Sequence, residues 1–286
     1  VLDCVLESKN DGFFPSIIPV NSDGQLDIKF LKKNIDEKTL LVSIMSVNNE
    51  TGIKIDLREV IELCHSMGVI FHSDYSQSLF TKDNLSLNDL RIDAISISGH
   101  KIYGPKGIGA LITRDIPTNL FSPISFGGLQ EGDIRSGTTP VFLSAGLAIA
   151  IKELSKNRIE YFDDLQKKKK EFYQLLKQNL PSIKLNNFIN KGHPGTLNLY
   201  FPNILADMLC SNLGGKVALS TSAACSGIDF EYSHVLKSMG LSIERSKASI
   251  RLCVGLFTTH TDILNAVHFI KSAVDQLSDL NQSNIN

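Results

Sequence analysis

The sequence predicts an α/β protein with a mostly parallel, doubly wound sheet and a smaller C-terminal α+β domain. Two observations lead to this prediction. Through the first half of the chain, short apolar runs alternate with helical patterns of roughly 10–15 residues. After residue 140, a long Lys- and Glu-rich helical stretch leads into a region of mixed strands and helices. We therefore expect a large domain over residues 1–150 and a small domain over residues 151–286.

The elements of the first half follow in order. An apolar stripe at Val1, Leu2, Val5 and Leu6 predicts an opening helix. Because no capping residue precedes this stripe, the helix is entered part-way, which indicates a fragment of a longer chain. Further helices are expected at 27–34 and 57–67. Strands are expected at 40–47, 69–72, 93–98 and 109–113, the first of them an apolar run typical of a strand buried on both faces.

The second half of the chain is predicted to contain a long helical stretch followed by a small domain of strands and helices. A long helical stretch, either one bent helix or two consecutive helices, is expected over 142–180, and its Lys167–Lys170 run is typical of a solvated helix face. Strands at 196–201, 217–220 and 249–254 and helices at 205–213 and 262–277 would form the small domain. The tail from residue 281 reads as frayed.

Composition excludes several classes of protein. The chain has 286 residues and a formal net charge of −1, without a basic patch that would favour nucleic-acid binding. No apolar run is long enough to span a membrane and no signal peptide is present, so we expect a cytoplasmic protein. Its five cysteines, odd in number and without a C-x-x-C spacing, favour reduced thiols over disulfides or a structural metal site.

Polar clusters follow three of the predicted strands, after Val47, His72 and Ser98. In doubly wound sheets, ligands bind beyond the carboxyl ends of the strands. These clusters therefore predict one binding site.

The strongest segment is S-I-S-G-H-K-I-Y-G-P-K-G-I-G, residues 96–109. Lys101 lies there in a tight glycine-rich turn after a buried strand, where partial desolvation favours the neutral, nucleophilic amine. Ser98 and His100 flank it and could donate hydrogen bonds to a phosphate. For an isolated lysine, the alternative is a surface side chain in a glycine-rich turn.

Three other positions could support the same chemistry. Asp74 could keep the nitrogen of a cofactor ring protonated, and its alternative is a loop-capping role. Asn49 could supply a donor or simply mark a turn. Arg251 could bind a carboxylate bidentately, and its alternative is a structural salt bridge.

Five motifs then occur in the order found in one family: V-N-N-E-T-G (47–52), H-S-D-Y-S-Q (72–77), S-G-H-K-I-Y-G-P-K-G-I-G (98–109), R-S-G-T (135–138) and S-I-R-L (249–252). The chain resembles the cysteine desulfurases, which belong to the class-V aminotransferases of fold type I. The resemblance covers essentially the whole chain. It implies pyridoxal 5′-phosphate (PLP) as the cofactor and no metal.

The resemblance also implies a role for each site residue. Lys101 would bind PLP covalently, Asp74 would pair with the pyridine nitrogen and Gln77 would contact the ring oxygen. Phosphate contacts would come from Ser98, His100 and, across a homodimer interface, Thr138. Asn49, itself a cofactor contact, and Arg251 would hold the substrate carboxylate. Cys225 would be the nucleophile that receives sulfur, whereas the other cysteines are typical of small buried side chains: Cys4, Cys64, Cys210 and Cys253.

The implied reaction moves sulfur from L-cysteine to Cys225 as a persulfide and releases L-alanine. The sulfur would serve iron–sulfur clusters or thiolated tRNA, through an acceptor or scaffold protein. Two alternatives stay open. A selenocysteine lyase or another class-V aminotransferase would share Lys101 and Asp74, and a truncated, catalytically silent remnant or interaction subunit would keep the sheet without the cofactor.

The chain departs from the family pattern in three places. The N-terminal portion that in relatives carries a phosphate-binding loop and a stacking histidine does not precede Val1 in this sequence. Ser222-Ala-Ala replaces the usual Gly-Ser-Ala before Cys225. Tyr75 stands where a small residue is usual after the aspartate, and strand alternation would point it away from the ring.

Overall fold

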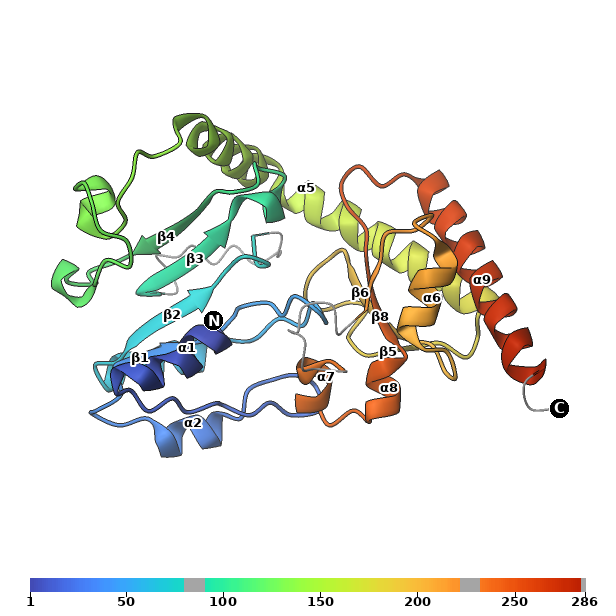
Figure 1. Ribbon diagram of the computed structural model, residues 1–286, viewed down its shortest axis with the longest axis horizontal. Coiled ribbons are helices and arrows are strands. Elements are labelled where there is room, and N and C mark those ends of the chain that lie inside the picture. The colour runs from blue at the N-terminus through green and yellow to red at the C-terminus, as the bar shows by residue number, and fades with distance from the viewer. Residues whose placement is uncertain (80–90, 222–231, 284–286) are drawn as a thin grey trace. The chain divides into compact units, whose positions relative to one another are not determined.

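The computed structural model describes residues 1–79, 91–221 and 232–283 (Figure 1). The chain divides into two compact units. Unit 1 comprises Val1–Ser16, Lys32–Ser46 and Asp56–Arg158, and unit 2 comprises Ile17–Leu31, Val47–Ile55 and Ile159–Asn286. A functional domain boundary at residue 150 stays a prediction.

Unit 1 is built on a four-stranded sheet with the order β1-β2-β3-β4. The strands are β1 (Leu41–Ser43), β2 (Ile70–Asp74), β3 (Ala94–Ser98) and β4 (Gly109–Thr113). The first three run parallel and β4 pairs antiparallel with β3. This is the mostly parallel α/β sheet that the sequence predicts, and the strands expected at 93–98 and 109–113 are confirmed almost to the residue.

The expected strand at 40–47 is shorter than predicted. β1 ends at Ser43, although the amides of Ile44 and Ser46 still bond to the carbonyls of His72 and Asp74, each at 3.0 Å. Leu41 and Met45 are 47% and 37% exposed, so the prediction of burial on both faces is wrong. The run alternates instead, with Val42 and Ile44 facing the core.

Among the residues that the structure describes, the first part of the chain contains the helices α1 (Leu2–Glu7), α2 (Ile28–Asn34) and α3 (Arg58–Ser66). α3 contacts β2 and buries Val60, Ile61 and Cys64 on one side. Short 3₁₀ turns occur at Ser8–Asp11, Gly99–Ile102, Thr118–Leu120 and Gln130–Asp133.

The predicted long helix is confirmed as α5 (Val141–Asn179), which passes from unit 1 into unit 2 after Arg158. The prediction that its Lys167–Lys170 run is a solvated face is wrong for Lys169, which is fully buried. The Nζ of Lys169 donates to the carbonyl of His193 at 2.9 Å, and that of Lys168 donates to the carbonyl of Leu256 at 2.8 Å. Part of the run therefore bonds to loops of unit 2.

Unit 2 contains an antiparallel sheet with the order β5-β6-β8-β7. Its strands are β5 (Lys184–Leu185), β6 (Thr196–Tyr200), β7 (Ser220–Thr221) and β8 (Ser249–Cys253). β7 begins where the predicted strand 217–220 was expected to end. Figure 1 shows α6 (Ala206–Leu213) and α9 (His260–Ser283) in contact beside this sheet.

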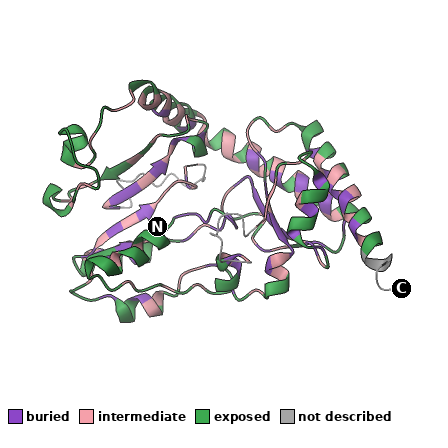
Figure 2. Ribbon diagram, viewed as in Figure 1, coloured by how far each residue is buried: buried purple, intermediate pink, exposed green. Residues whose placement is uncertain are grey.

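Strand alternation gives the sheet of unit 2 two different faces. Leu197 and Leu199 of β6 and Ile250 and Leu252 of β8 are buried and form its apolar face. Both strands are largely buried, as the purple in Figure 2 shows. The opposite face carries polar side chains and is described with the site below.

Two short helices, α7 (His234–Ser238) and α8 (Ile243–Lys247), were not predicted. Each has five residues, which is too few for an apolar period to stand out. Their N-cap residues could have been recognised in the sequence, however, because serine is a favoured N-cap. Ser233 and Ser242 accept bonds from the amides of Leu236 and Arg245.

Within the described ranges, none of the helices combines the length and apolar content that a membrane span requires. Cys4, Cys64, Cys210 and Cys253 are free thiols. Cys64 is buried as expected, but Cys4 and Cys253 are exposed, so the prediction of buried side chains is wrong for these two. No cluster of three or more His, Cys, Asp or Glu side chains in the same part of the chain could hold a metal ion.

Candidate active site

Lys101 lies in the loop between β3 and β4, within the 3₁₀ turn Gly99–Ile102. Its side chain is exposed, so the structure has the surface position that the sequence left as the alternative and not the expected partial desolvation. Two backbone bonds close this loop, from the amide of Gly99 to the carbonyl of Ile108 (3.0 Å) and from the amide of Gly104 to the carbonyl of Gly99 (2.9 Å). The loop is therefore a fixed turn at the end of a buried strand.

Glycine is required in this loop because backbone atoms approach closely. A Cβ on Gly109 would lie 2.5 Å from the carbonyl oxygen of Ile97, and one on Gly104 would lie 2.9 Å from that of Gly99. Neither backbone atom can move without opening the loop. The glycine spacing that singled out Lys101 in the sequence thus reflects the packing that holds it.

Asp74 is the last residue of β2, the parallel neighbour of β3, and its register partner is Ser96. Ser98 lies two residues further along β3, so these three side chains share one face of the sheet. The Asp74 Oδ1 accepts a bond from the amide of Ser76 at 2.9 Å. Asp74 therefore has the capping role that the sequence left open, and its position at the carboxyl end of the strand is also the expected ligand-binding one.

His72 continues this polar face and was not predicted to have a role. Its Nδ1 lies 2.7 Å from the Ser43 Oγ and its Nε2 lies 2.8 Å from the Ser96 Oγ, so it joins β1, β2 and β3. Burial lowers the pKa of His72, against an opposing effect of Asp74. The H-S-D spacing, which puts His72 and Asp74 on one face, was the available signal.

Unit 1 contains four other predicted site residues: Ser98, His100, Gln77 and Thr138. The Ser98 Oγ and the His100 Nδ1 are 2.9 Å apart beside Lys101, and Gln77 is half-buried in the turn after β2. Thr138 is exposed on a different segment, just before α5. Tyr75, the residue after β2, is half-buried and interacts with the Ser46 side chain, while burial raises the pKa of its hydroxyl.

Unit 2 brings together the two residues expected to bind a substrate carboxylate. The Arg251 Nη1 donates to the backbone carbonyl of Asn49 at 2.9 Å, and its Nη2 donates to the Ser220 Oγ at 3.1 Å. Arg251 is half-buried and the Asn49 side chain is exposed. Within the described residues, these two contacts hold the guanidinium by neutral oxygens.

Glu50, next to Asn49, is a further residue that sequence reasoning missed. It is 3% exposed, and its Oε2 accepts a bond from the Ser233 hydroxyl at 2.5 Å. Burial raises the pKa of Glu50, and Ser233, His234 and Arg251 oppose the shift. A buried carboxylate thus anchors the loop that carries Asn49.

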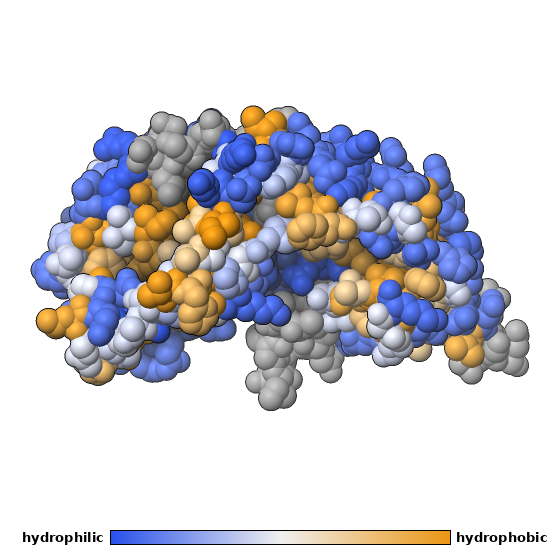
Figure 3. All heavy atoms as spheres, turned by 90° about the horizontal axis from the view of Figure 1, so that it is seen from above, coloured by the Kyte–Doolittle hydropathy of each residue, from blue (hydrophilic) through white to orange (hydrophobic). Residues whose placement is uncertain are grey.

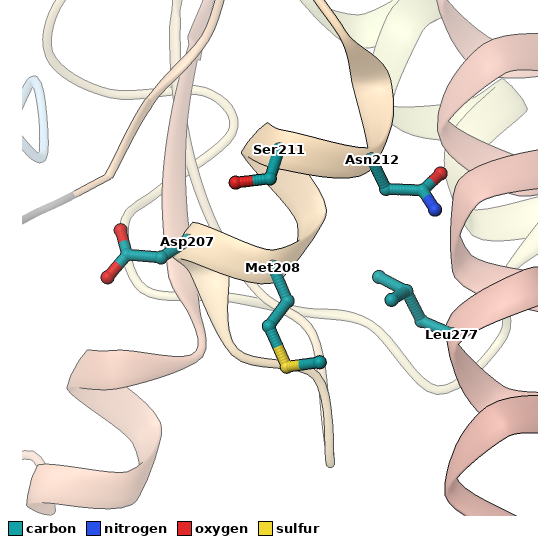
Figure 4. Close-up of a pocket in the computed structure, with 5 residues that line it drawn as sticks. All are labelled: Asp207, Met208, Ser211, Asn212 and Leu277. Atoms are coloured by element: carbon teal, nitrogen blue, oxygen red, sulfur yellow. The ribbon is translucent and has the colours of Figure 1, made fainter.

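Cys225 lies outside the described residues, as do the substitutions at 222–224. The site residues of the described chain therefore form two groups: Asp74, Ser98, His100 and Lys101 in unit 1, and Asn49 with Arg251 in unit 2. An open depression between α6 and α9 contains none of them (Figure 4). It is lined by Asp207, Met208, Ser211, Asn212 and Leu277.

Comparison with known proteins gives a consistent picture. Residues 8–265 match the family model for class-V aminotransferases. The chain is 38% identical to the probable mitochondrial cysteine desulfurase of Dictyostelium discoideum, over 97% of this chain and 62% of that protein. It is also 38% identical to the cysteine desulfurase IscS of Rickettsia africae, over 98% of this chain and 68% of that protein.

Solved structures agree with these sequence matches. A NifS-like protein superimposes with a TM-score of 0.85 at 29% identity, covering 97% of this chain and 72% of that one. The NifS-like protein of Rickettsia africae gives a TM-score of 0.81 at 28% identity, covering 94% and 72%. The chain spans slightly less than two thirds of the length of the first curated relatives.

Proposed function

Because the chain belongs to the cysteine desulfurases of the class-V aminotransferase family, we propose that it carries out PLP-dependent desulfuration of L-cysteine. One observation supports this most directly. Lys101 stands on a fixed glycine-rich turn, at the same end of the sheet as Asp74, Ser98 and His100. The family's cofactor, PLP, needs an amine, an anionic partner for its ring nitrogen and donors for its phosphate.

The residues of unit 1 fit that cofactor. The exposed Lys101 amine can bind it covalently, and the Asp74 carboxylate can hold a proton on the ring nitrogen. The adjacent Ser98 hydroxyl and His100 imidazole can bind the phosphate. Gln77 would contact the ring oxygen, Asn49 would supply a further contact, and Thr138 would reach the phosphate of a second subunit.

The protein's own residues then divide the work. When bound, PLP draws electrons from the α-carbon of an attached amino acid. Arg251 and Asn49 would hold the substrate carboxylate, and the Lys101 amine, released when the substrate amine takes its place, would take the α-proton. The Asp74 carboxylate would pair with the ring nitrogen.

Cys225 completes the proposed reaction as the nucleophile. Its thiolate attacks the sulfur of the bound cysteine, forming an S–S bond while the substrate's Cβ–S bond breaks. The electron pair of the broken bond stays with the carbon fragment, which takes up protons and leaves as L-alanine. Sulfur is oxidised and carbon is reduced in the same step, so no external oxidant is needed.

We also propose that the protein acts as a homodimer. In unit 1, Ile124, Phe126 and Leu129 are 95%, 86% and 81% exposed, and Val141 and Phe142 are 75% and 77% exposed. Figure 3 shows apolar side chains exposed on the side of the molecule that carries this segment. Monomers rarely leave such a cluster uncovered, and Thr138 lies within it in sequence.

The product sulfur would pass from Cys225 to an acceptor or scaffold protein, for iron–sulfur clusters or thiolated tRNA. A cytoplasmic location remains the expectation from the reduced cysteines. The curated relatives include mitochondrial and mitosomal enzymes as well as bacterial ones.

The test uses the purified full-length protein mixed with PLP and L-cysteine. The wild type should develop the visible absorbance of lysine-bound PLP and release sulfide and alanine. Lys101→Ala should lose that absorbance, whereas Lys106→Ala, an exposed lysine of the same loop, should keep it. Cys225→Ser should keep the absorbance but lose sulfide release by several orders of magnitude, unlike Cys210→Ser.

Each outcome decides between the proposals. A wild type without the absorbance band would favour the silent remnant or interaction subunit. Turnover of selenocysteine in preference to cysteine would favour the lyase. Sulfide release by Cys225→Ser at the wild-type rate would remove the nucleophile assignment.

A further inference from the structure

The loop that carries Asn49 is folded around the side chain of Asn48. The Asn48 Oδ1 accepts bonds from the amides of Glu50 and Thr51, both at 2.9 Å, and from the Thr51 hydroxyl at 3.1 Å. The loop closes through the amide of Gly52, which donates to the carbonyl of Asn48 at 2.9 Å. Its own bonds therefore turn the carbonyls of residues 49–52 outward.

Each of these four carbonyls accepts a hydrogen bond from another part of unit 2. Asn49 receives one from the Arg251 Nη1 (2.9 Å), and Glu50 receives one from the Asn198 Nδ2 (3.1 Å). Thr51 receives one from the Asn187 Nδ2 (2.6 Å), and Gly52 receives one from the amide of His193 (2.8 Å). We call residues 49–52 the carbonyl row.

The sheet of unit 2 explains why these donors line up. Asn198 of β6 and Ser220 of β7 are both register partners of Arg251 in β8. Because register partners in antiparallel strands point to the same face, the three side chains form one line across the sheet. Arg251 is thus held between the carbonyl row and Ser220, next to Asn198.

Asn198 has a fixed orientation. It is fully buried, and its Oδ1 accepts a bond from the Asn186 Nδ2 at 2.8 Å. The Asn186 Oδ1 in turn accepts a bond from the Arg245 Nε at 2.7 Å. An amide whose oxygen is engaged in this way must present its NH₂ group to the carbonyl of Glu50.

We propose that Asn198, supported by Asn187, is a positioning residue that holds Asn49 and Arg251 as one preassembled clamp for the carboxylate of an amino-acid substrate. The two bonds that Arg251 makes to described residues leave further N–H groups of its guanidinium for a ligand. Asn49, whose backbone carbonyl accepts a bond from Arg251, has an exposed side chain. The inference rests on the proposed function for the identity of the substrate but on unit 2 alone for the clamp.

The first measurement is amide hydrogen exchange of the full-length protein without substrate. Asn198→Asp keeps the acceptor for Asn186 but replaces the donor to Glu50 with an oxygen. Exchange in residues 47–55 should accelerate by about tenfold, because a buried hydrogen bond is lost. Asn187→Asp, at a half-buried position, should have the same effect if Asn198→Asp folds poorly.

The second measurement is steady-state desulfuration. The KM for L-cysteine should rise about tenfold in both variants, while kcat stays within about threefold of the wild type. Asn179→Asp is the matched control, since its Nδ2 also donates to a backbone carbonyl, that of Leu175 at 2.9 Å, at an exposed position. It should change neither quantity.

The outcomes separate this inference from the proposed function. Unchanged exchange of residues 47–55 in both variants would overturn the clamp, whatever the activity. Faster exchange with an unchanged KM would refute the role of the clamp in substrate binding. A fall in kcat as large as the rise in KM would also refute that role. A wild type that releases no sulfide would refute the proposed function and leave the exchange result standing.

Discussion

Lys169 places an amine in the interior of unit 2, where it bonds to the carbonyl of His193. Burial lowers its pKa from 10.5 to about 8, and Lys170 adds to the shift. His193 also donates its amide to Gly52, the last member of the carbonyl row. Lys169, which the sequence predicted to be solvated, therefore supports the loop that carries Asn49.

This burial predicts a pH-dependent stability. Between about pH 8 and 10.5, Lys169 is neutral in the folded state but still protonated in the unfolded state. The unfolded state then binds more protons, so raising the pH through this window stabilises the fold. The wild type should gain up to about 3 kcal/mol relative to Lys169→Met between pH 7.5 and 10.5, measured by urea unfolding.

Lys167→Met is the control, since Lys167 is exposed on the same helix. Its stability difference from the wild type should stay constant over the same pH range. A constant difference for Lys169→Met as well would show that the ammonium group is solvated in the folded protein.

Residues whose role depends on local sequence were predictable. Lys101 was found because its glycines, which pack against Ile97 and Gly99, lie within a few positions of it. Asp74 was found because it ends an apolar strand. Glu50 and Asn198 were not found, since their bonds join positions 183 and 148 residues apart and no local pattern records such a partner.

Among the elements, the loop between β3 and β4 determines how rigidly the lysine is held. Its entry and exit are paired strand ends, Ser98 with Gly109, and its interior is closed by backbone bonds. The loop closes through close contacts between backbone atoms. Adding a methyl group to one of its glycines should therefore destabilise the loop more than removing a side-chain contact at the surface.

Gly109→Ala tests this expectation. The new Cβ would lie 2.5 Å from the carbonyl oxygen of Ile97, so the β3–β4 pair must shift. We expect a loss of about 1–3 kcal/mol in urea unfolding and weaker PLP binding. Gly128→Ala is the control, because its Cβ would meet only the flexible end of the Gln130 side chain. Equal stability of the two variants would contradict the account of the loop.

Helices and strands with a long or regular apolar pattern were predicted best. α5, β3, β4 and α9 agree with the sequence because each repeats its pattern or fills an uninterrupted apolar run. β1 and β7 differ because the extent of pairing, not the apolar run, sets where a strand ends. α7 and α8 are capped single turns whose serines give the only signal among their described residues.

At the scale of the whole molecule, two early segments belong to the later unit. Ile17–Leu31 and Val47–Ile55 cluster with unit 2, although the chain around them belongs to unit 1. Asn187 and Thr51, which bond to each other, are 136 residues apart. The change in composition after residue 140 led to the predicted boundary at residue 150, which stays a prediction, whereas the continuous stretch of unit 2 begins at Ile159. Composition cannot reveal a loop contributed from far upstream.

The exposed apolar segment of unit 1 leads to a prediction about assembly. If a second copy covers Phe126 and Leu129, which are 86% and 81% exposed, their removal should weaken the dimer. Burying such a side chain contributes about 1.5–3 kcal/mol, so the double variant Phe126→Ser/Leu129→Ser should raise the dimer Kd at least about tenfold in sedimentation equilibrium. Leu280→Ser, at a 56% exposed position on α9, is the control and should leave the Kd unchanged.

A monomeric wild type would contradict the homodimer itself. A dimeric double variant with the wild-type Kd would place the interface elsewhere on the surface. Since Thr138 lies between Leu129 and α5, loss of the dimer should also lower PLP affinity, which links assembly to the cofactor site.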